Sequence, residues 1–202
     1  MTVNVEFHFD FGSPNAYLSH RVVPEIERRT GVEFAYVPVL LGGVFKLTNN
    51  GPPMAQNKGV LNKSEYQQRE TDRFIAKHGI AFAWNPDFPV NTLKIMRGAV
   101  AAEIDGCLPA YVETIYANMW ERPKKLDEVE LIRSVLDAAG LDGAALMART
   151  DDQAVKDKLT ANTAASVERG TFGSPTFFVG DEMFFGKDRL RDVEEEIAAA
   201  SG

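Results

Sequence analysis

A strictly alternating stretch near the N-terminus constrains this chain more than any other feature. From Val3 to Phe11, apolar residues occupy every second position and polar residues fill the positions between them. Alternation with a period of two is typical of a β-strand with one buried face. Gly12 ends the pattern, and Ser13 and Pro14 stand where a helix N-cap and a first helical residue belong. The sequence therefore predicts a strand, a tight turn and a helix that begins at Ser13.

This junction is suited to holding an anion. The first turn of a helix has N–H groups without an internal partner, and it carries the positive end of the helix dipole. Ser13 adds a hydroxyl group at the same place. A serine before proline is more often only a helix cap, so the local sequence alone favours the structural role over an anion site.

The first third of the chain predicts a β-α-β unit. Apolar residues recur every four positions after Pro14, which indicates an amphipathic helix that contains Pro24 and ends near Gly31. Residues 32–41 are rich in aromatic and β-branched side chains and predict a second strand. A unit of this spacing implies a parallel strand pair joined by a right-handed crossover.

The middle of the chain is helical in character. Gly42-Gly43 predicts the start of a loop that continues to Pro53, and residues 81–91 predict an aromatic, proline-rich loop. Between and after these loops, helical periodicity predicts helices over residues 64–78, 92–104, 109–120, 126–139 and 142–148, and from Thr150 or Asp151 to Gly170.

The C-terminal part returns to strands. Two short apolar runs, 176–179 and 183–185, flank Gly180-Asp181, which predicts a two-residue hairpin turn. A final helix is expected from Arg189 to Ala199. The element order predicts an α/β fold in which residues 1–42 and 168–202 form one mixed sheet and residues 43–167 form a helical insertion domain.

This order resembles the thioredoxin fold, and a second local signal agrees with it. Ser174-Pro175 stands directly before a strand, where thioredoxin-like proteins have a cis-proline next to the active site. X–Pro bonds are cis in only about 5–6% of cases, so the dipeptide alone does not predict the cis form. Together with the element order, it predicts a cis peptide bond between Ser174 and Pro175.

Two segments carry a narrower resemblance. Residues 9–18 (FDFGSPNAYL) and 172–190 (FGSPTFFVGDEMFFGKDRL) resemble the 2-hydroxychromene-2-carboxylate isomerases and the related kappa-class glutathione transferases of the DsbA superfamily. The resemblance implies glutathione as cofactor and a serine, matched by Ser13, in place of a redox cysteine. In the family this serine donates a hydrogen bond to the glutathione sulfur. With both segments present, we favour this catalytic role of Ser13 over a role as cap alone.

The resemblance also implies which residues hold glutathione. Ser174, followed by Pro175, matches the residue whose backbone meets the cysteinyl part in a strand-like manner. A second group of matched positions holds the γ-glutamyl end: Phe185, Gly186, Lys187 and Asp188. Lys187 replaces the asparagine or glutamine typical of its position, and Asp188 is also expected to cap the last helix.

The expected substrate contacts lie in the insertion. Lys46 matches a lysine that the isomerases use toward the substrate carboxylate, although an exposed lysine is usually only solvated. Asn57 or Asn50 could replace the amide of an Asn-Arg pair in the isomerases, but no arginine stands nearby. Trp84 and Phe88 could line an aromatic substrate, although aromatic residues at this density are more often core.

Composition excludes several classes of function. A net charge of −7 argues against nucleic acid and anionic membranes as partners, and no apolar run is long enough to span a membrane. Cys107 is the single cysteine, so neither an intrachain disulfide nor a protein dithiol can form. The three histidines lack metal-ligand spacing, and no metal site is expected. The predicted strand begins at Val3 and leaves no room for a signal peptide, so we expect a cytoplasmic protein; the family implies a homodimer.

The leading functional hypothesis is a glutathione-dependent isomerase of aromatic-compound catabolism, such as naphthalene degradation. As the resemblance implies, reversible addition of the thiolate interconverts 2-hydroxychromene-2-carboxylate and trans-o-hydroxybenzylidenepyruvate, and no glutathione is consumed. A kappa-class-like transferase that conjugates glutathione to electrophiles is the alternative. Two further classes are a DsbA-type oxidoreductase, which the lack of a Cys-x-x-Cys motif disfavours, and a non-catalytic glutathione-binding protein.

Overall fold

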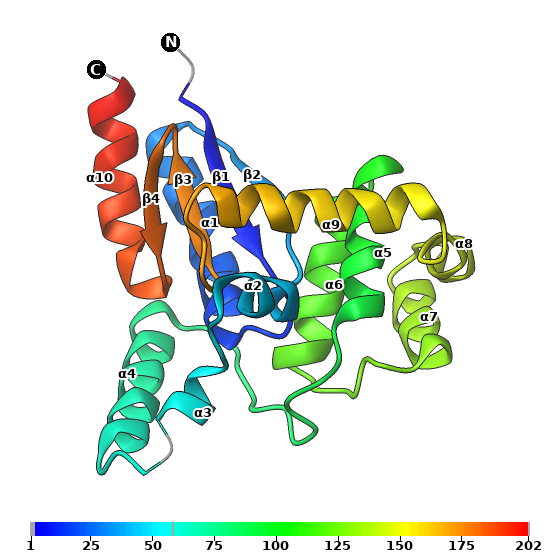
Figure 1. Ribbon diagram of the computed structural model, residues 1–202, viewed down its shortest axis with the longest axis horizontal. Coiled ribbons are helices and arrows are strands. Elements are labelled where there is room, and N and C mark those ends of the chain that lie inside the picture. Colours follow the sequence, from blue (N-terminus) through cyan, green and yellow to red (C-terminus); the bar gives the residue numbers. More distant parts are fainter. Residues whose placement is uncertain (1–2, 58, 202) are drawn as a thin grey trace.

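A mixed sheet built from both ends of the chain organises the fold (Figure 1). The computed structural model describes residues 3–57 and 59–201, and within them four strands pair in the order β2-β1-β3-β4. The strands are β1 (Val5–Phe9), β2 (Phe34–Pro38), β3 (Thr176–Val179) and β4 (Glu182–Phe185). β1 is parallel to β2 and antiparallel to β3, and β3 and β4 form the expected hairpin. The mixed sheet predicted from the sequence is confirmed.

The first helix forms as the sequence predicts. α1 (Pro14–Thr30) begins after Ser13, whose Oγ accepts a hydrogen bond from the Ala16 N–H at 3.2 Å, and it ends at Gly31 in the left-handed conformation (φ 72°). Such a C-cap favours glycine because a Cβ atom would be strained there. β1 ends at Phe9, two residues before the alternating pattern does, so Asp10 and Phe11 belong to the turn.

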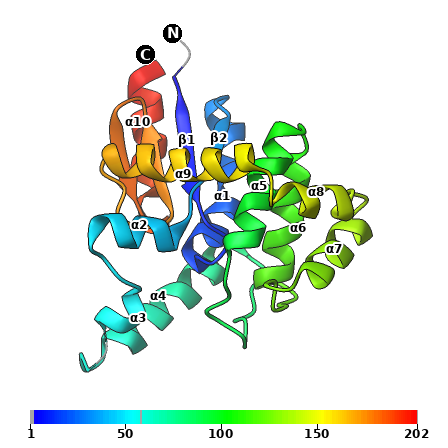
Figure 2. The ribbon, with the colours of Figure 1, turned by 45° about the vertical axis from the view of Figure 1, so that its right-hand side comes forward.

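Helices cover both faces of the sheet. Figures 1 and 2 show α9 (Gln153–Glu168) crossing one face, while α1 and α10 (Leu190–Ser201) pack together on the other side. A short 3-10 turn, η1 (Lys187–Arg189), connects β4 to α10. α9 begins after Asp152, one residue later than the predicted caps Thr150 and Asp151. The Asp152 side chain makes no capping hydrogen bond.

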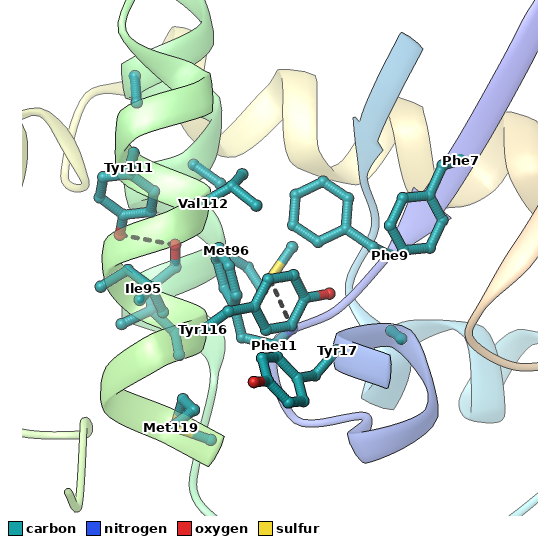
Figure 3. Close-up of a cluster of buried hydrophobic side chains, with 14 of the residues drawn as sticks. Phe7, Phe9, Phe11, Tyr17, Ile95, Met96, Tyr111, Val112, Tyr116 and Met119 are labelled. Carbon is teal, nitrogen blue, oxygen red and sulfur yellow. Dashed lines mark hydrogen bonds between the residues drawn. The ribbon is translucent and has the colours of Figure 1, made fainter. Parts of the chain in front are cut away.

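The core lies where the sheet meets the helical insertion. α5 (Leu93–Ile104) and α6 (Leu108–Trp120) lie beside the C-terminal end of β1, and α7 (Val129–Ala138) and α8 (Gly143–Arg149) pack on their outer side. Figure 3 shows the buried side chains of Phe9 and Phe11 directed at Tyr116 of α6. The Phe11 and Tyr116 ring centroids lie 4.8 Å apart with the rings edge to face, which is a favourable aromatic geometry.

The predicted loop from Gly42 to Pro53 is wrong, because α2 (Leu41–Thr48) occupies most of it. Glycine costs a helix about 1 kcal/mol relative to alanine, and two adjacent glycines predict a loop. Gly43 lets α2 approach α9 closely, because a Cβ atom at this position would lie 3.1 Å from the Thr163 side chain of α9. Burial of Val44 and this close approach hold α2 against α9, and Asn49 in the left-handed conformation (φ 52°) ends the helix.

Two further helices, α3 (Pro53–Gln56) and α4 (Lys63–His78), extend away from the sheet. α4 matches the predicted helix over 64–78 within one residue. Among the described helices, none is both long and apolar enough to cross a membrane.

Candidate active site at the Ser13 turn

The two sequence segments that carry the resemblance meet in space. The Ser174–Pro175 peptide bond is cis, as expected. The Ser13 hydroxyl donates a hydrogen bond to the Ser174 carbonyl oxygen at 2.7 Å, while its oxygen accepts the Ala16 N–H. Only 5% of Ser13 and 8% of Ser174 are exposed. Ser13 is therefore a helix cap and, with the same oxygen, a partner of the cis-proline loop.

The turn that presents Ser13 is held by bonds to its backbone. The Ser13 N–H donates to the Asp10 carbonyl at 3.0 Å, and the buried Trp120 indole Nε1 of α6 donates to the Phe11 carbonyl at 2.9 Å. The Phe11 N–H points at the Met96 sulfur of α5, 3.5 Å away (Figure 3). Because the partners come from the insertion, packing between the two parts of the protein fixes the position of the Ser13 hydroxyl.

Asp10 was not singled out from the sequence, yet it is completely buried in this turn. Its Oδ1 accepts the Gly12 N–H at 2.8 Å, and its Oδ2 accepts the Leu41 N–H at 2.8 Å and the Thr92 hydroxyl at 3.2 Å. Its own N–H donates to Ser174 Oγ at 3.2 Å. The period-two pattern of the sequence places Asp10 on the polar, exposed face of the strand. The one local sign that it could be buried is its position between two phenylalanines, Phe9 and Phe11.

The C-terminal segment surrounds Ser174. The Gly186 N–H donates to the Pro175 carbonyl at 3.0 Å, and Gly186 has a φ of 98°, which favours glycine. Phe185 is partly exposed and packs on Phe172, with 4.4 Å between ring centroids. A Cβ atom at Gly173 would lie only 2.6 Å from the Phe185 ring. This glycine allows the two aromatic rings to lie directly beside the cis-proline loop.

Lys187 is buried, whereas the neighbouring Asp188 is exposed. Lys187 is only 5% exposed, and its Nζ lies 2.7 Å from Asp188 Oδ1 and 5.1 Å from the Phe74 ring centroid of α4. Both residues line a cleft of about 320 Å³ between α1, α4 and α10. Asp188 is exposed and lies inside η1, where Gly186 is the cap residue, so the expected capping role of Asp188 is wrong. The backbone follows a tight 3-10 turn here, which places the cap two residues earlier.

The expected substrate residues are dispersed over the insertion. Trp84 and Phe88 pack on Trp120, with ring centroids 6.3 and 5.7 Å away, which connects the aromatic loop to the Ser13 turn. Lys46 is exposed on α2. Asn57 is buried, and its Nδ2 donates to Gln67 Oε1 at 2.6 Å.

Asn50, the other amide considered, reaches the cis-proline loop. Its Nδ2 donates to the Phe172 carbonyl at 2.8 Å, while its Oδ1 accepts the Gly51 N–H at 2.8 Å. Asn50 therefore connects the end of α2 with the residues that precede Ser174.

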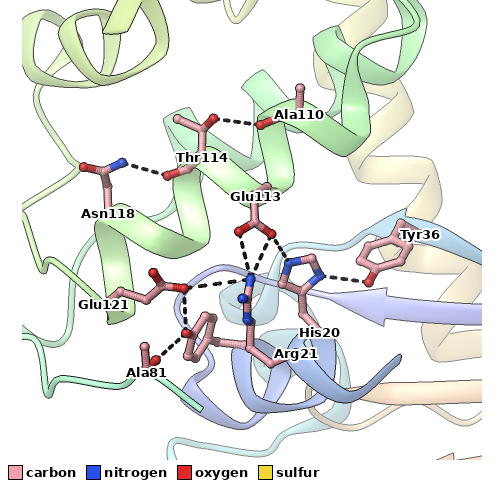
Figure 4. A network of polar contacts seen from close by, with 10 residues as sticks. His20, Arg21, Tyr36, Ala81, Ala110, Glu113, Thr114, Asn118 and Glu121 are labelled. Carbon is pink, nitrogen blue, oxygen red and sulfur yellow. Dashed lines mark hydrogen bonds and ion pairs between the residues drawn. The ribbon is translucent and has the colours of Figure 1, made fainter. Parts of the chain in front are cut away.

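A polar network next to the site connects α1 with α6 (Figure 4). His20 Nδ1 lies 2.8 Å from the Tyr36 hydroxyl, and its Nε2 lies 3.1 Å from Glu113 Oε2. Arg21 donates to both oxygens of Glu113 at 2.8 and 3.0 Å. The hydrogen bond with His20, followed by the charge of Arg21, lowers the pKa of Glu113 to about 2. This network stabilises the contact between α1 and α6 and does not reach Ser13.

His8 also has a structural environment. It is buried, its Nδ1 lies 2.8 Å from Ser166 Oγ and its Nε2 lies 2.8 Å from Glu6 Oε2. Burial lowers the pKa of His8. Within the described residues, no group of three or more His, Cys, Asp or Glu side chains is arranged to hold a metal ion.

The comparisons with known proteins agree with this geometry. 2-hydroxychromene-2-carboxylate isomerase of Sphingobium xenophagum is 27% identical over 98% of this chain and 99% of its own length. Glutathione S-transferase kappa 1 of Rattus norvegicus is 25% identical over 92% of this chain and 87% of its own length. A solved structure of 2-hydroxychromene-2-carboxylate isomerase superposes with a TM-score of 0.84 at 27% identity, over 98% of this chain and 95% of that chain.

The expected thioredoxin-like fold with a helical insertion is thereby confirmed. The family model of the DSBA-like thioredoxin domain matches residues 4–198, nearly the whole chain. This protein belongs to the DSBA-like thioredoxin domain family.

Proposed function

We propose that this protein is a glutathione-dependent isomerase that interconverts 2-hydroxychromene-2-carboxylate and trans-o-hydroxybenzylidenepyruvate or a related aromatic intermediate. The observation that carries the proposal is the Ser13 hydroxyl at the N-terminus of α1, 2.7 Å from the carbonyl oxygen of the cis-proline loop. The named isomerase relatives along nearly the full chain support the reaction class.

The groups around Ser13 and Ser174 fit a peptide-like thiol. The Ser174 N–H has no acceptor among the described residues, and its carbonyl bonds only the Ser13 hydroxyl there. A free donor and a carbonyl on one residue suit antiparallel pairing with a cysteinyl backbone. Phe172 and Phe185 add partly exposed apolar surface beside them. Ser13, Ser174 and Pro175, together with the 185–188 segment, are therefore the residues proposed to hold glutathione.

When bound, glutathione supplies a thiolate that adds reversibly to the substrate. A free thiol has a pKa near 8.5, and lowering it by one unit requires about 1.4 kcal/mol of preference for the anion. The hydroxyl of Ser13 provides a charge-assisted hydrogen bond, and the N-terminus of α1 provides its positive dipole end, which together are of this size. With glutathione bound, the Ser13 hydroxyl would donate to the sulfur in place of the Ser174 carbonyl, which would then be available to the cofactor backbone.

The protein's own thiol is badly placed for this chemistry. Cys107 precedes α6, whereas Trp120 at the opposite end of that helix contacts the Ser13 turn. A helix of 13 residues is about 20 Å long, so Cys107 and Trp120 lie at opposite ends of α6. Burial raises the pKa of the Cys107 thiol and makes it a weaker nucleophile. A borrowed thiol is therefore the better source of the nucleophile.

The direct test follows isomerisation of 2-hydroxychromene-2-carboxylate by absorbance with and without reduced glutathione. We expect turnover only with glutathione, and oxidised glutathione as a matched control should not support it. Turnover without any thiol would overturn the cofactor assignment. Glutathione binding by calorimetry without turnover would retain the cofactor site and reject this substrate.

A kappa-class-like transferase is the second candidate, and the region around Asn57 favours it. This asparagine is buried against Gln67, and the Gly51-Pro52-Pro53 segment carries no arginine. A substrate site that lacks the isomerase amide and arginine would accept simpler electrophiles. Conjugation of glutathione to chlorodinitrobenzene, without turnover of the chromene, would favour the transferase.

A further inference from the structure

The starts of α2 and α5 and the turn before α1 converge on the carboxyl group of Asp10. α1 begins four residues after it, the N–H of Leu41 belongs to the first residue of α2, and Thr92 is the cap residue of α5. Leu41 and Thr92 both contact Asp10 Oδ2, at 2.8 and 3.2 Å, and the Gly12 N–H contacts Oδ1 at 2.8 Å. One side chain therefore connects the Ser13 turn to the start of the proposed substrate helix α2 and to the start of α5.

The chemistry of these contacts suits an ionised carboxylate. All three partners donate hydrogen bonds, and an ionised carboxylate only accepts them. Burial raises the pKa of the Asp10 carboxyl, while the N–H groups of Leu41 and Gly12 and the hydroxyl of Thr92 oppose that shift. The positive ends of the α2 and α5 dipoles, whose first residue and cap residue contact Oδ2, also favour a negative charge here. A buried carboxyl group in an enzyme core without such donors would be strongly destabilising.

The turn packs closely around this carboxyl. A Cβ atom at Gly12 would lie 3.0 Å from Thr92 Cγ2 and 3.2 Å from Asp10 Oδ1. Gly12 of the turn therefore packs directly against the side chains of Asp10 and Thr92. Asp10 also donates its own N–H to Ser174 Oγ, so it contacts both segments of the proposed cofactor site.

We propose that Asp10 is a positioning residue: it fixes the Ser13 hydroxyl relative to the cis-proline loop and to α2, without contacting the substrate. This inference rests on the proposed role of Ser13 toward glutathione. It predicts that loss of the Asp10 contacts weakens the hydrogen bond from Ser13 to the thiolate. The bound thiol should then have a higher pKa, and turnover should fall.

The test compares Asp10→Asn with Thr92→Val. Asparagine is nearly isosteric, but its NH2 group must face at least one of the three donors. Thr92→Val removes one donor and leaves the charge of Asp10 in place. Thr92→Ser keeps the hydroxyl, and Thr150→Val removes a buried hydroxyl that donates to the Met147 carbonyl at 2.7 Å and makes no contact with Asp10. These last two variants are the matched controls.

The main measurement is the pKa of glutathione bound to the full-length protein, read from thiolate absorbance near 240 nm during a pH titration. We expect a rise of about one unit in Asp10→Asn and a smaller rise in Thr92→Val, with no shift in either control. Turnover should fall at least tenfold in Asp10→Asn. Hydrogen exchange at Leu41 and Gly12 without glutathione should become faster in the same variant.

The outcomes separate this inference from the proposed function. If the thiol pKa falls in Asp10→Asn and stays constant in Thr92→Val, Asp10 acts through its charge and the positioning role is wrong. Reduced stability with unchanged thiol pKa and turnover per folded molecule would leave Asp10 as scaffold only and also overturn it. A wild-type protein that does not lower the glutathione pKa would overturn the proposed function, and the inference with it.

Discussion

The Ser13 turn and the α3–α4 arm, residues 53–78, are built in opposite ways. In the turn, the polar groups of Asp10 and Ser13 are buried and hydrogen-bonded to distant segments of the chain. In the arm, α4 has no fully buried residue, Leu61 is 86% exposed and Tyr66 is 60% exposed. The comparison teaches that the turn proposed to hold the cofactor is fixed by buried, long-range contacts, whereas the arm has few buried side chains.

The largest effect is expected from Ser13→Ala. Loss of one hydrogen bond that stabilises a developing or resting anion costs about 100-fold or more in turnover. The N-cap bond to Ala16 is lost as well, which lowers the free energy of unfolding by about 1 kcal/mol. Steady-state kinetics at saturating glutathione measure the first effect and urea unfolding the second. Ser13→Thr keeps the hydroxyl and is the control; near wild-type turnover of Ser13→Ala would reject the role of Ser13.

Trp120→Phe should have the next largest effect, on stability. The buried indole donates to the Phe11 carbonyl at 2.9 Å, and phenylalanine leaves that carbonyl without its partner. An unsatisfied buried carbonyl plus a small cavity should lower the free energy of unfolding by about 2 kcal/mol. Urea denaturation checks this value. Trp84→Phe is the matched control because Trp84 is 46% exposed; equal losses in both variants would show that the turn is not specially constrained.

Lys46→Ala tests the expected substrate contact on α2, which lies outside both compared regions. If the ammonium group of Lys46 binds the substrate carboxylate, its loss should raise KM for the chromene about tenfold, which corresponds to about 1.4 kcal/mol. The KM for glutathione should stay constant. Lys125→Ala removes another exposed lysine, between α6 and α7, and should change neither constant. An unchanged chromene KM in Lys46→Ala would place the carboxylate site elsewhere.

These expectations show how much of the fold was accessible from sequence. β1, α1 and the β3–β4 hairpin were predicted because each depends on local alternation, caps or turn residues, whereas the cis bond before Pro175 was predicted only together with the element order that resembles the thioredoxin fold. α2 was missed because its stability comes from contact with α9, in particular the close approach of Gly43 to Thr163. Long-range contacts of this kind leave no periodic signal in a single sequence.

Part of the candidate site could likewise be predicted from the sequence, and part of it could not. Ser13 and Ser174 were predicted as neighbours from two segments separated by 161 positions, and the structure brings them within hydrogen-bond distance. Asp10, Thr92 and Trp120 were not identified as parts of the turn. Their roles arise from where the insertion packs, and an isolated aspartate or tryptophan in the sequence gives no information on its distant partner.

A smaller effect is expected from acid titration of the polar network between α1 and α6. The pKa of Glu113 is lowered to about 2 in the folded protein, against about 4.3 for an ordinary glutamate. Its stabilising contribution is therefore fully present above about pH 4.3 and is lost as the pH falls toward about 2. Because more than half of the Glu113 side chain is exposed, screening limits this contribution to about 1 kcal/mol.

Urea unfolding of the wild type and of Glu113→Gln between pH 2 and 7 measures this contribution. The difference between the two unfolding free energies should be largest at pH 5–7 and vanish near pH 2. Glu195→Gln is the control, because this carboxylate makes an exposed ion pair with Arg191 within α10. A difference that stays constant with pH would mean that the effect of the substitution comes from packing and not from the charge of Glu113.

The smallest effect should come from Leu61→Ser in the α3–α4 arm. A side chain that is 86% exposed loses almost no buried apolar area on substitution, so the free energy of unfolding should change by less than about 0.5 kcal/mol. Urea unfolding at two protein concentrations tenfold apart checks this. The family resemblance implies a homodimer, and a dimer that buried the arm would change the result. Stability would then depend on protein concentration and would fall by more than about 1 kcal/mol in Leu61→Ser, which would remove the contrast between the arm and the Ser13 turn.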